Sequence, residues 1–265
     1  MGTVRPAAVA GTFYPADPRV LRRTVTDLLA HDPTLSVDVI PRMVIVPHAG
    51  YVYSGPVAAC AYRLLSTSAA EAALLVGPSH FVAFTGMATP GVDALATPLG
   101  EMPTDSALVA RAEGHPLVAP RPIAHNREHS LEVQLPFLQT ILPGVTVVPL
   151  LTGDVAPESV GRVLAHLLDR PGVVGVISSD LSHYLPYEQA RRKDAATVAS
   201  IRELRPEDLS WDDACGLTGI QAALLVACDR GWSCRLLDHR NSGDTAGTRD
   251  SVVGYAAFAI GPLIG

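Results

Sequence analysis

The sequence has few aromatic and few charged residues, and it lacks the cysteine pairs that build zinc ribbons. Aromatic residues make up 5% of its 265 residues and charged residues 17%, and the net charge is −6. A chain with so few rings and no excess of positive charge lacks the means for base stacking and phosphate binding, so we expect no nucleic-acid partner. None of the four cysteines forms a C-x-x-C pair, which argues against a zinc ribbon, a thioredoxin-type site and a disulfide scaffold.

Other missing patterns remove further classes of protein. The longest apolar stretch, residues 251–265, is too short and too rich in glycine to cross a bilayer, and no signal peptide is visible. The Gly-x-Ser-x-Gly, Walker A and G-x-G-x-x-G motifs are also absent, which disfavours an α/β-hydrolase, a P-loop NTPase and a standard dinucleotide-binding protein. We therefore expect a cytoplasmic protein with no membrane partner.

Hydrophobic residues account for 48% of the chain, enough to bury a sizeable core. Short apolar runs predict buried strands over residues 42–47, 72–77, 145–151, 173–178, 234–238 and 251–260. Apolar residues at helical spacing predict helices over Asp17–His31, Gly55–Leu65, Pro157–Leu168, Tyr187–Leu204 and Gly219–Asp229. This alternation predicts an α/β fold of three layers, in which helices cover both faces of a mostly parallel central sheet.

No break in composition divides residues 1–265, so we expect a single domain. Residues 87–127 are polar and contain prolines, with one short helix candidate at Thr104–Glu113. We interpret this stretch as an excursion from the core.

Polar residues follow the ends of four predicted strands. The segments are Pro47–Tyr51, Gly77–His80, Ser179–His183 and His239–Asp244. Because the carboxyl ends of parallel strands meet at one edge of a sheet, we expect these segments to converge. Two imidazoles and a carboxylate suit Fe(II), and zinc accepts the same ligands. His48 and His80 are the first two candidate metal ligands, and Asp244 is the third.

Two further pairs have the spacing of neighbours on a helix. His129 and Glu132 lie three residues apart, as do Asp180 and His183. In each pair the histidine suits a general base that the carboxylate orients, and His129 also suits an outer partner of the metal. We take all four as candidate catalytic residues.

Each of these residues also has a plain structural interpretation. A histidine at a strand end, such as His48 or His80, commonly bonds a carbonyl and fixes a turn. Asp244 lies in strong turn chemistry, and the pair His129–Glu132 is compatible with an exposed ion pair. Cys215 is interpreted as a small buried hydrophobic residue rather than as a reactive thiol.

Taken in order, these segments resemble the Memo family, whose archaeal and bacterial members are often labelled AmmeMemoRadiSam system protein B. The segments that carry the resemblance are AGTFYP (10–15), PHAGYVYSG (47–55), GPSH (77–80), EHSLEVQLP (128–136), SSDLSHY (178–184) and NSGDTAGTRDSVVGY (241–255). They extend over nearly the whole chain. The resemblance implies an α/β domain similar to class III extradiol dioxygenases of the LigB type, which hold non-haem Fe(II) and cleave catechols with O₂.

The resemblance also implies roles for individual residues. His48 and His80 match the two metal histidines of the family, while the third ligand, a cysteine in the animal protein, falls on Thr245 beside Asp244. The chain therefore lacks that thiolate, which weakens the case for Cu(I) relative to Fe(II). Fe(II) is the metal we expect first, with copper and zinc as alternatives.

By the dioxygenase analogy, His129 and His183 act as acid–base groups, and Asp180 orients His183. Phe13 stands where the animal protein has tryptophan. The expected substrate-binding residues are Phe13, Tyr14, Tyr53, Ser79 and Thr245.

Three functions remain open at this stage. The first is a metal-dependent oxidoreductase acting on a small aromatic or enolic molecule. The second is a non-catalytic module that binds an anionic ligand or a modified peptide in the same pocket. The third is zinc-dependent hydrolysis with His129 or Glu132 as the base. The family label also associates the protein with an AMMECR-type protein and a radical S-adenosylmethionine enzyme.

Overall fold

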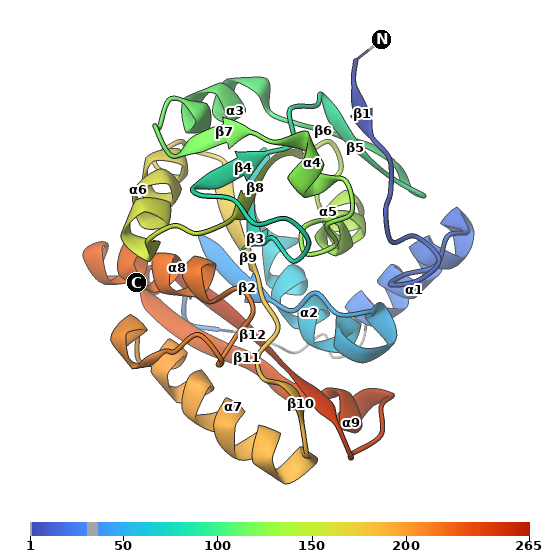
Figure 1. Ribbon diagram of the computed structural model, residues 1–265, viewed down its shortest axis with the longest axis vertical. Coiled ribbons are helices and arrows are strands. Elements are labelled where there is room, and N and C mark those ends of the chain that lie inside the picture. The colour runs from blue at the N-terminus through green and yellow to red at the C-terminus, as the bar shows by residue number, and fades with distance from the viewer. Residues whose placement is uncertain (1, 31–36) are drawn as a thin grey trace.

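A long mixed sheet forms the centre of the protein in the computed structural model, which describes residues 2–30 and 37–265 (Figure 1). Within these residues the strands follow the order β10-β12-β2-β9-β3-β8-β4-β7, and β11 also pairs with β12. The strands are β2 (Met43–Val46), β3 (Ala72–Pro78), β4 (Met87–Thr89), β7 (Val118–Pro120), β8 (Thr146–Thr152), β9 (Val173–Ser178), β10 (His183–Leu185), β11 (Ser233–Asn241) and β12 (Val252–Gly261).

The sheet corrects our expectation of mostly parallel strands. The neighbours β2, β9, β3 and β8 run parallel, but β12 is antiparallel to β2, β10 and β11, and β4 is antiparallel to β8. Because both faces of β12 are covered, its sequence is apolar almost throughout, as is usual for a strand in a parallel sheet. The connection from β11 to β12 is nevertheless too short for a crossover helix that returns the chain in the same direction.

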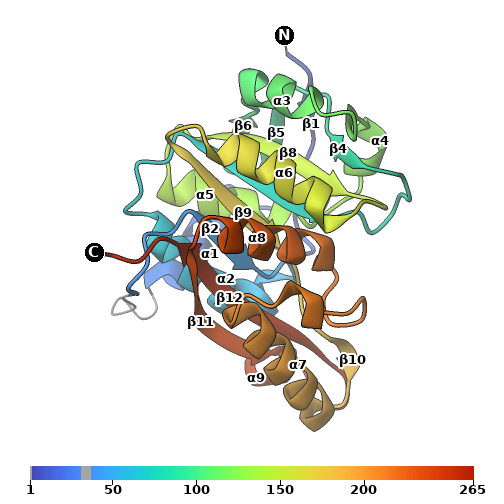
Figure 2. The same cartoon turned by 90° about the vertical axis from the view of Figure 1, so that its left-hand side faces the viewer.

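Helices cover both faces of the sheet and form the three layers expected from the sequence (Figure 2). Along β2, Val44 and Val46 belong to one buried cluster, whereas Met43 and Ile45 belong to the other. The first cluster packs under α1 (Pro18–Ala30), α2 (Tyr51–Leu65) and α5 (Leu135–Ile141). The second packs under α3 (Ser106–Glu113), α6 (Pro157–Leu168), α7 (Tyr187–Arg202) and α8 (Leu217–Asp229). Strand alternation therefore supplies apolar residues to both layers of helices.

The predicted helices are present: Pro157–Leu168 has the predicted bounds, and the others have shifted ends. The helix expected over Asp17–His31 is α1, which begins at Pro18 because the Asp17 carboxylate accepts bonds from the backbone of Arg19 and Val20. Its predicted last residue, His31, lies outside the described residues. The shorter helical elements are α4 (Pro122–His125), η1 (Glu132–Gln134), η2 (Pro206–Asp208) and α9 (Ser242–Thr245).

The stretch 87–127 is richer in strands than the sequence suggested. Besides the predicted helix, found as α3, it contributes β4 and β7 to the edge of the main sheet. It also contributes β5 (Ala94–Thr97) and β6 (Gly100–Pro103), which form a small sheet with β1 (Val4–Arg5). Strands of two to four residues are too short to show a period, which explains why the pattern missed them.

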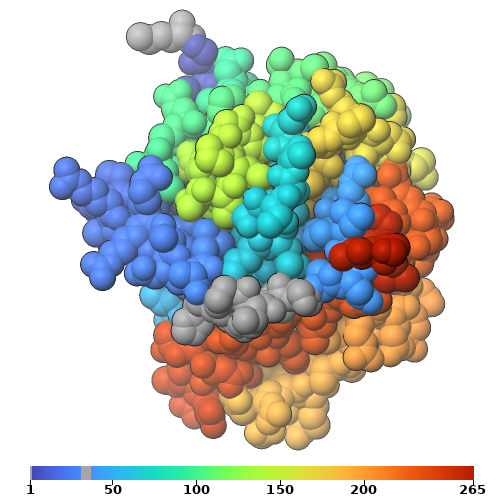
Figure 3. Space-filling model, turned by 180° about the vertical axis from the view of Figure 1, so that it is seen from behind, coloured from blue at the N-terminus to red at the C-terminus, as the bar shows by residue number. Residues whose placement is uncertain are grey.

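The segment that precedes β2 and the segment that follows β12 lie side by side on the face opposite to that seen in Figure 1. Figure 3 shows the C-terminal residues, in red, against the blue segment that leads into β2. Here Ile40 bonds the carbonyl of Pro262, and Ile264 bonds the carbonyl of Asp38. Among the described residues, no helix combines the length and apolar character needed to cross a membrane.

Candidate metal centre and pocket

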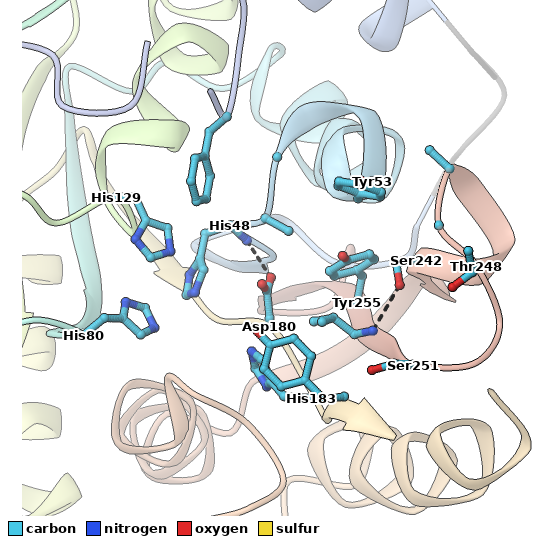
Figure 4. Close-up of a pocket in the computed structure, with 17 residues that line it drawn as sticks. His48, Tyr53, His80, His129, Asp180, His183, Ser242, Thr248, Ser251 and Tyr255 are labelled. Atoms are coloured by element: carbon cyan, nitrogen blue, oxygen red, sulfur yellow. Dashed lines mark hydrogen bonds between the residues drawn. The ribbon is translucent and has the colours of Figure 1, made fainter. Parts of the chain in front are cut away.

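A pocket of about 730 Å³ opens at the carboxyl ends of β2, β3 and β9 (Figure 4). Its size falls within the usual range for sites that bind small molecules. It is lined by Phe13, His48, Ala49, Gly50, Tyr53, His80, His129, Asp180, His183, Tyr184, Ser242, Ala246, Gly247, Thr248, Ser251, Val253 and Tyr255. All four expected strand-end segments therefore contribute to the pocket. Three of them do so at the ends of β2, β3 and β9, and the fourth does so at Ser242, directly after β11.

Three histidines gather at one end of this pocket. His48, His80 and His129 each offer a ring nitrogen, and these three atoms lie within 4.8 Å of one another. The ring of His80 stacks on that of His129, with centroids 4.7 Å apart, and His48 meets both rings edge-on. Such a cluster can hold a metal ion.

The hydrogen bonds of His48 fix the form of its ring. The Ser178 hydroxyl donates its proton to the carbonyl of Ser130, at 2.6 Å, so it accepts from the Nδ1–H of His48 at 2.9 Å. The same hydroxyl accepts from Gln134 Nε2. Because Nδ1 carries the proton, the lone pair of His48 lies on Nε2, the form that a metal ligand requires.

One carboxylate, Glu128, orients the other two histidines. Its Oε1 lies 2.9 Å from Nδ1 of His80 and 3.3 Å from Nδ1 of His129. Its oxygens also accept the backbone N–H groups of His80, His129 and Ser130. A carboxylate behind a histidine holds the ring and raises its basicity as a ligand. Glu128 was not among the site residues predicted from the sequence, although its place directly before His129 was a usable signal.

Burial favours the uncharged forms of His48 and His129. Burial lowers the pKa of His129 to about 4, and burial, with the neighbouring His80 and His129, holds the pKa of His48 well below its ordinary value. Burial alone would raise the pKa of Glu128, but its hydrogen bonds with His80 and Ser130 lower it to about 2. At neutral pH His48 and His129 are therefore uncharged imidazoles, and Glu128 is an ionised carboxylate.

Asp180 supports the loop of His48 rather than the ring of His183. Its Oδ1 accepts the backbone N–H of His48 at 2.7 Å, the bond drawn in Figure 4. Burial raises the pKa of this carboxyl to about 7. Burial lowers the pKa of His183, although a hydrogen bond to the backbone of Leu181 acts in the opposite direction. His183 lines the pocket as a neutral imidazole with one ring nitrogen available to accept a proton.

Glu132, a candidate catalytic residue, anchors the N-terminal segment instead of facing the pocket. Its buried carboxylate accepts from the Arg5 guanidinium at 2.7 Å, from the Tyr14 hydroxyl at 2.6 Å, and from the backbone of Ala8 and Val9. These four donors occupy both oxygens. They hold the segment that presents Phe13, whose ring lies 4.7 Å from that of His129 (centroid to centroid).

Asp244 lies away from the three histidines. It is the third residue of α9, and its Oδ2 accepts the backbone N–H of Asn241 in a capping box while its Oδ1 accepts the Tyr187 hydroxyl. It lines a separate cavity together with Tyr187 and Arg240. The structure thus brings His129, and not Asp244, to His48 and His80. The local hydrogen bond from the backbone of Asn241 to Asp244, three residues later, caps α9 and turns the Asp244 carboxylate toward the start of that helix.

The expected substrate-binding residues divide into two groups. Phe13 and Tyr53 line the pocket. Tyr14 is buried on Glu132, Ser79 donates to the carbonyl of Val82, and Thr245 donates to the carbonyl of Ser242; these three do not line it.

Cys215 lies beside the histidine cluster, a place that the sequence did not predict, but its thiol is not an activated one, in agreement with our interpretation. Its Sγ is 3.2 Å from Nε2 of His48 and 3.3 Å from the backbone nitrogen of Asp180. Burial, together with the charge of Asp180, raises the pKa of the thiol to about 12. The thiol is therefore protonated and can donate its S–H to the free lone pair of His48.

The other end of the pocket is lined by tyrosines and hydroxyl groups. Figure 4 shows Tyr53, Tyr255, Ser242, Thr248 and Ser251 on the side away from His80 and His129. They come from α2, α9, β12 and the loop between α9 and β12, so segments distant in sequence close this end. Apart from Tyr53, none of these residues was predicted from the sequence as a site residue.

Comparison with known proteins gives one consistent result. A family model described as Memo-like protein matches residues 5–259. A "MEMO1 family protein" of Aquifex aeolicus is 37% identical, with 95% of this chain and 97% of the relative covered. Proteins of the same description from Ignicoccus hospitalis and Archaeoglobus fulgidus are 38% and 36% identical, each over 96% of this chain and at least 97% of the relative. The chain therefore belongs to the Memo family.

Proposed function

We propose that this protein is a metal-dependent redox protein, related to class III extradiol dioxygenases, that acts on a small aromatic or enolic molecule. The observation that carries the proposal is the convergence of His48, His80 and His129 beside a pocket of about 730 Å³. The third ligand is His129 in this proposal, because Asp244 caps α9.

The donor set fits a divalent metal. The lone pair of His48 lies on Nε2, and the Nδ1 atoms of His80 and His129 lie against Glu128, which leaves their Nε2 atoms free. Imidazole nitrogen suits iron, copper and zinc, and three protein ligands leave positions open for substrate. Bound iron or copper would supply redox chemistry with O₂, whereas zinc would supply only Lewis acidity.

The protein's own groups would bind and orient the substrate. A ring entering the pocket would lie between Phe13 near the histidines and Tyr53 and Tyr255 at the other end. His183 is the group we assign to accept a substrate hydroxyl proton, because its neutral ring keeps one nitrogen free. Asp180 holds the loop of His48 and so fixes that ligand against the pocket.

The test is the metal content of protein purified anaerobically from metal-balanced growth, measured by elemental analysis. We expect near-stoichiometric iron or copper in the wild type and its loss in the His48→Ala/His80→Ala double variant. The half-buried His115 and the exposed His166 provide a matched control, since the His115→Ala/His166→Ala variant removes two imidazoles outside the cluster and the pocket and should keep the metal. Oxygen consumption with a panel of phenols and enols follows on the loaded protein.

Other outcomes point to the other functions. Zinc in place of iron or copper would favour hydrolysis. Protein that is metal-free and resists loading would contradict the redox proposal and favour a non-catalytic pocket that binds a ligand or a peptide.

A further inference from the structure

Tyr184 has a backbone conformation that residues with a side chain rarely adopt. Its φ is +59°, in the left-handed region, where the Cβ of an L-residue crowds the following carbonyl oxygen. Among the described residues, one other residue besides glycine has a positive φ, Leu204 at +56°. Leu204 ends α7, where its N–H bonds the carbonyl of Ile201, and this conformation is common at such a helix end. Tyr184 ends no helix, so its conformation needs another explanation.

The conformation of Tyr184 places two consecutive side chains in the pocket. In a regular strand, His183 and Tyr184 would point to opposite faces of the sheet. In β10, however, His183 pairs with Val253, and Leu185 pairs with the residue directly before Val253. Two steps along β10 therefore match one step along β12, which makes a bulge at Tyr184. With this bulge, both His183 and Tyr184 line the pocket.

Buried hydrogen bonds fix the backbone next to Tyr184. The N–H of Leu181 bonds the carbonyl of Gly254, and the N–H of Gly254 bonds the carbonyl of Ser182. The N–H of Ser182 bonds the buried carboxylate of Asp194 at 3.1 Å. A Cβ at residue 254 would overlap that carboxylate, so glycine at this position allows the contact. The surrounding structure thus holds Tyr184 in a conformation that costs free energy, as happens at many ligand-binding sites.

Packing does not explain why this residue is a tyrosine. Its side chain is 76% exposed, and it is not part of either buried cluster. Its ring meets that of His183 edge-on, with the centroids 5.8 Å apart. Glycine or asparagine would adopt the same backbone conformation with less strain. A large, exposed ring at a strained position beside a pocket therefore indicates that the ring itself binds a ligand.

We propose that Tyr184 is a specificity-determining contact of the pocket, and that the bulge of β10 presents its ring so that an aromatic ligand packs against it. A pair of aromatic rings gains attraction beyond the area that it buries, whereas a saturated ring of similar size gains only from the area. The inference rests on the proposed function for the aromatic class of the ligand, and it adds the residue that selects this class. Because Tyr184 is not a metal ligand, the contact is the same with the metal bound or absent.

The test compares phenol with cyclohexanol, which carry one hydroxyl group on an aromatic ring and on a saturated ring. Their affinities are measured by ligand-observed NMR, on protein stripped of metal and again with zinc added. We expect Tyr184→Ala to weaken the binding of phenol about threefold to tenfold more than that of cyclohexanol. Tyr184→Phe keeps the ring and should bind phenol as the wild type does. Trp211→Ala is the matched control, because it removes a ring that is 86% exposed and lies outside the pocket.

A second measurement separates the ring from the backbone strain. Tyr184→Gly and Tyr184→Ala both lack the ring, but only the alanine variant keeps a Cβ that crowds the carbonyl oxygen. We expect the two variants to lose the same affinity for phenol. We also expect Tyr184→Gly to unfold at a higher urea concentration than Tyr184→Ala, because glycine adopts a positive φ without strain.

Each contrary result overturns the inference. Phenol that fails to bind the wild type, or that binds Tyr184→Ala as tightly, would show that the ring makes no contact with an aromatic ligand. An equal loss for cyclohexanol, or an equal loss in Trp211→Ala, would show that the ring does not select the ligand. A urea midpoint of Tyr184→Gly at or below that of Tyr184→Ala would show that the backbone is not strained. Because binding is measured with and without zinc, none of these results depends on the metal content that tests the proposed function.

Discussion

Replacing Glu132 with glutamine should destabilise the protein far more than removing an exposed charge. The side chain of Glu132 is fully buried and that of Arg5 is 4% exposed, and they meet at 2.7 Å. Glutamine keeps the shape but leaves the guanidinium without a counter-charge, and its NH₂ group replaces an oxygen that accepts from Val9 or Ala8. Breaking a buried pair in this way costs about 3–5 kcal/mol of unfolding free energy.

Urea unfolding followed by far-UV circular dichroism measures this effect. Asp27→Asn is the matched control: its pair with Arg23 spans 3.6 Å between side chains that are 70% and 85% exposed, and we expect a loss of at most about 0.5 kcal/mol. The double variant Arg5→Met/Glu132→Leu removes both charges, but it also leaves the Tyr14 hydroxyl and the backbone N–H groups of Ala8 and Val9 without their acceptor, so it should recover only part of the loss. A Glu132→Gln protein within about 1 kcal/mol of the Asp27→Asn protein would refute the reasoning.

Three further predictions concern protonation, metal affinity and packing. Burial lowers the pKa of His125 to about 4, below its ordinary 6.5, so the unfolded chain takes up the proton first as pH falls. The resulting contribution of about 3 kcal/mol to the free energy of unfolding is present above pH 6.5 and is lost as the pH falls toward 4. In the His125→Asn variant the free energy of unfolding, measured in urea, should therefore vary with pH by that much less than in the wild type. An unchanged pH dependence would contradict this. Glu128→Gln should weaken Co(II) binding about tenfold to a hundredfold in a chelator competition, while the exposed Glu158→Gln leaves it unchanged. Gly153→Ala should lower the unfolding free energy by about 2–3 kcal/mol, because its new methyl group would overlap the backbone carbonyl of Phe84, and a wild-type urea midpoint would contradict this.

The sequence predicted the strand-end part of the site well. His48, His80, Asp180 and His183 each follow a buried strand, and parallel neighbours bring such ends together whatever the loops do. This part depends on β2, β3 and β9 running parallel, a direction that the alternation of predicted strands and helices favours.

The sequence pointed to His129 as an acid–base group or an outer partner of the metal, but it could not predict that His129 joins His48 and His80 as a possible third ligand, nor the far end of the pocket. His129 reaches the cluster because Glu128 bonds the backbone and ring of His80, a contact between residues 48 positions apart. Asp244 had equally suitable chemistry but is held by a local cap. Tyr255 faces the pocket because β12 is antiparallel to β2, a direction that its continuous apolar sequence does not encode.

The position of β12 has a consequence for how the protein is made. This last strand lies between β2, near the start of the chain, and β10 and β11, so its pairing joins residues about 215 positions apart. Contacts of such long range form late, because the intervening chain must first be ordered. Residues 252–261 leave the ribosome after the strands that they pair with, and Val253 and Tyr255 among them line the pocket. A nascent or prematurely ended chain can therefore contain His48, His80 and His129 and still lack the wall of the pocket that β12 provides.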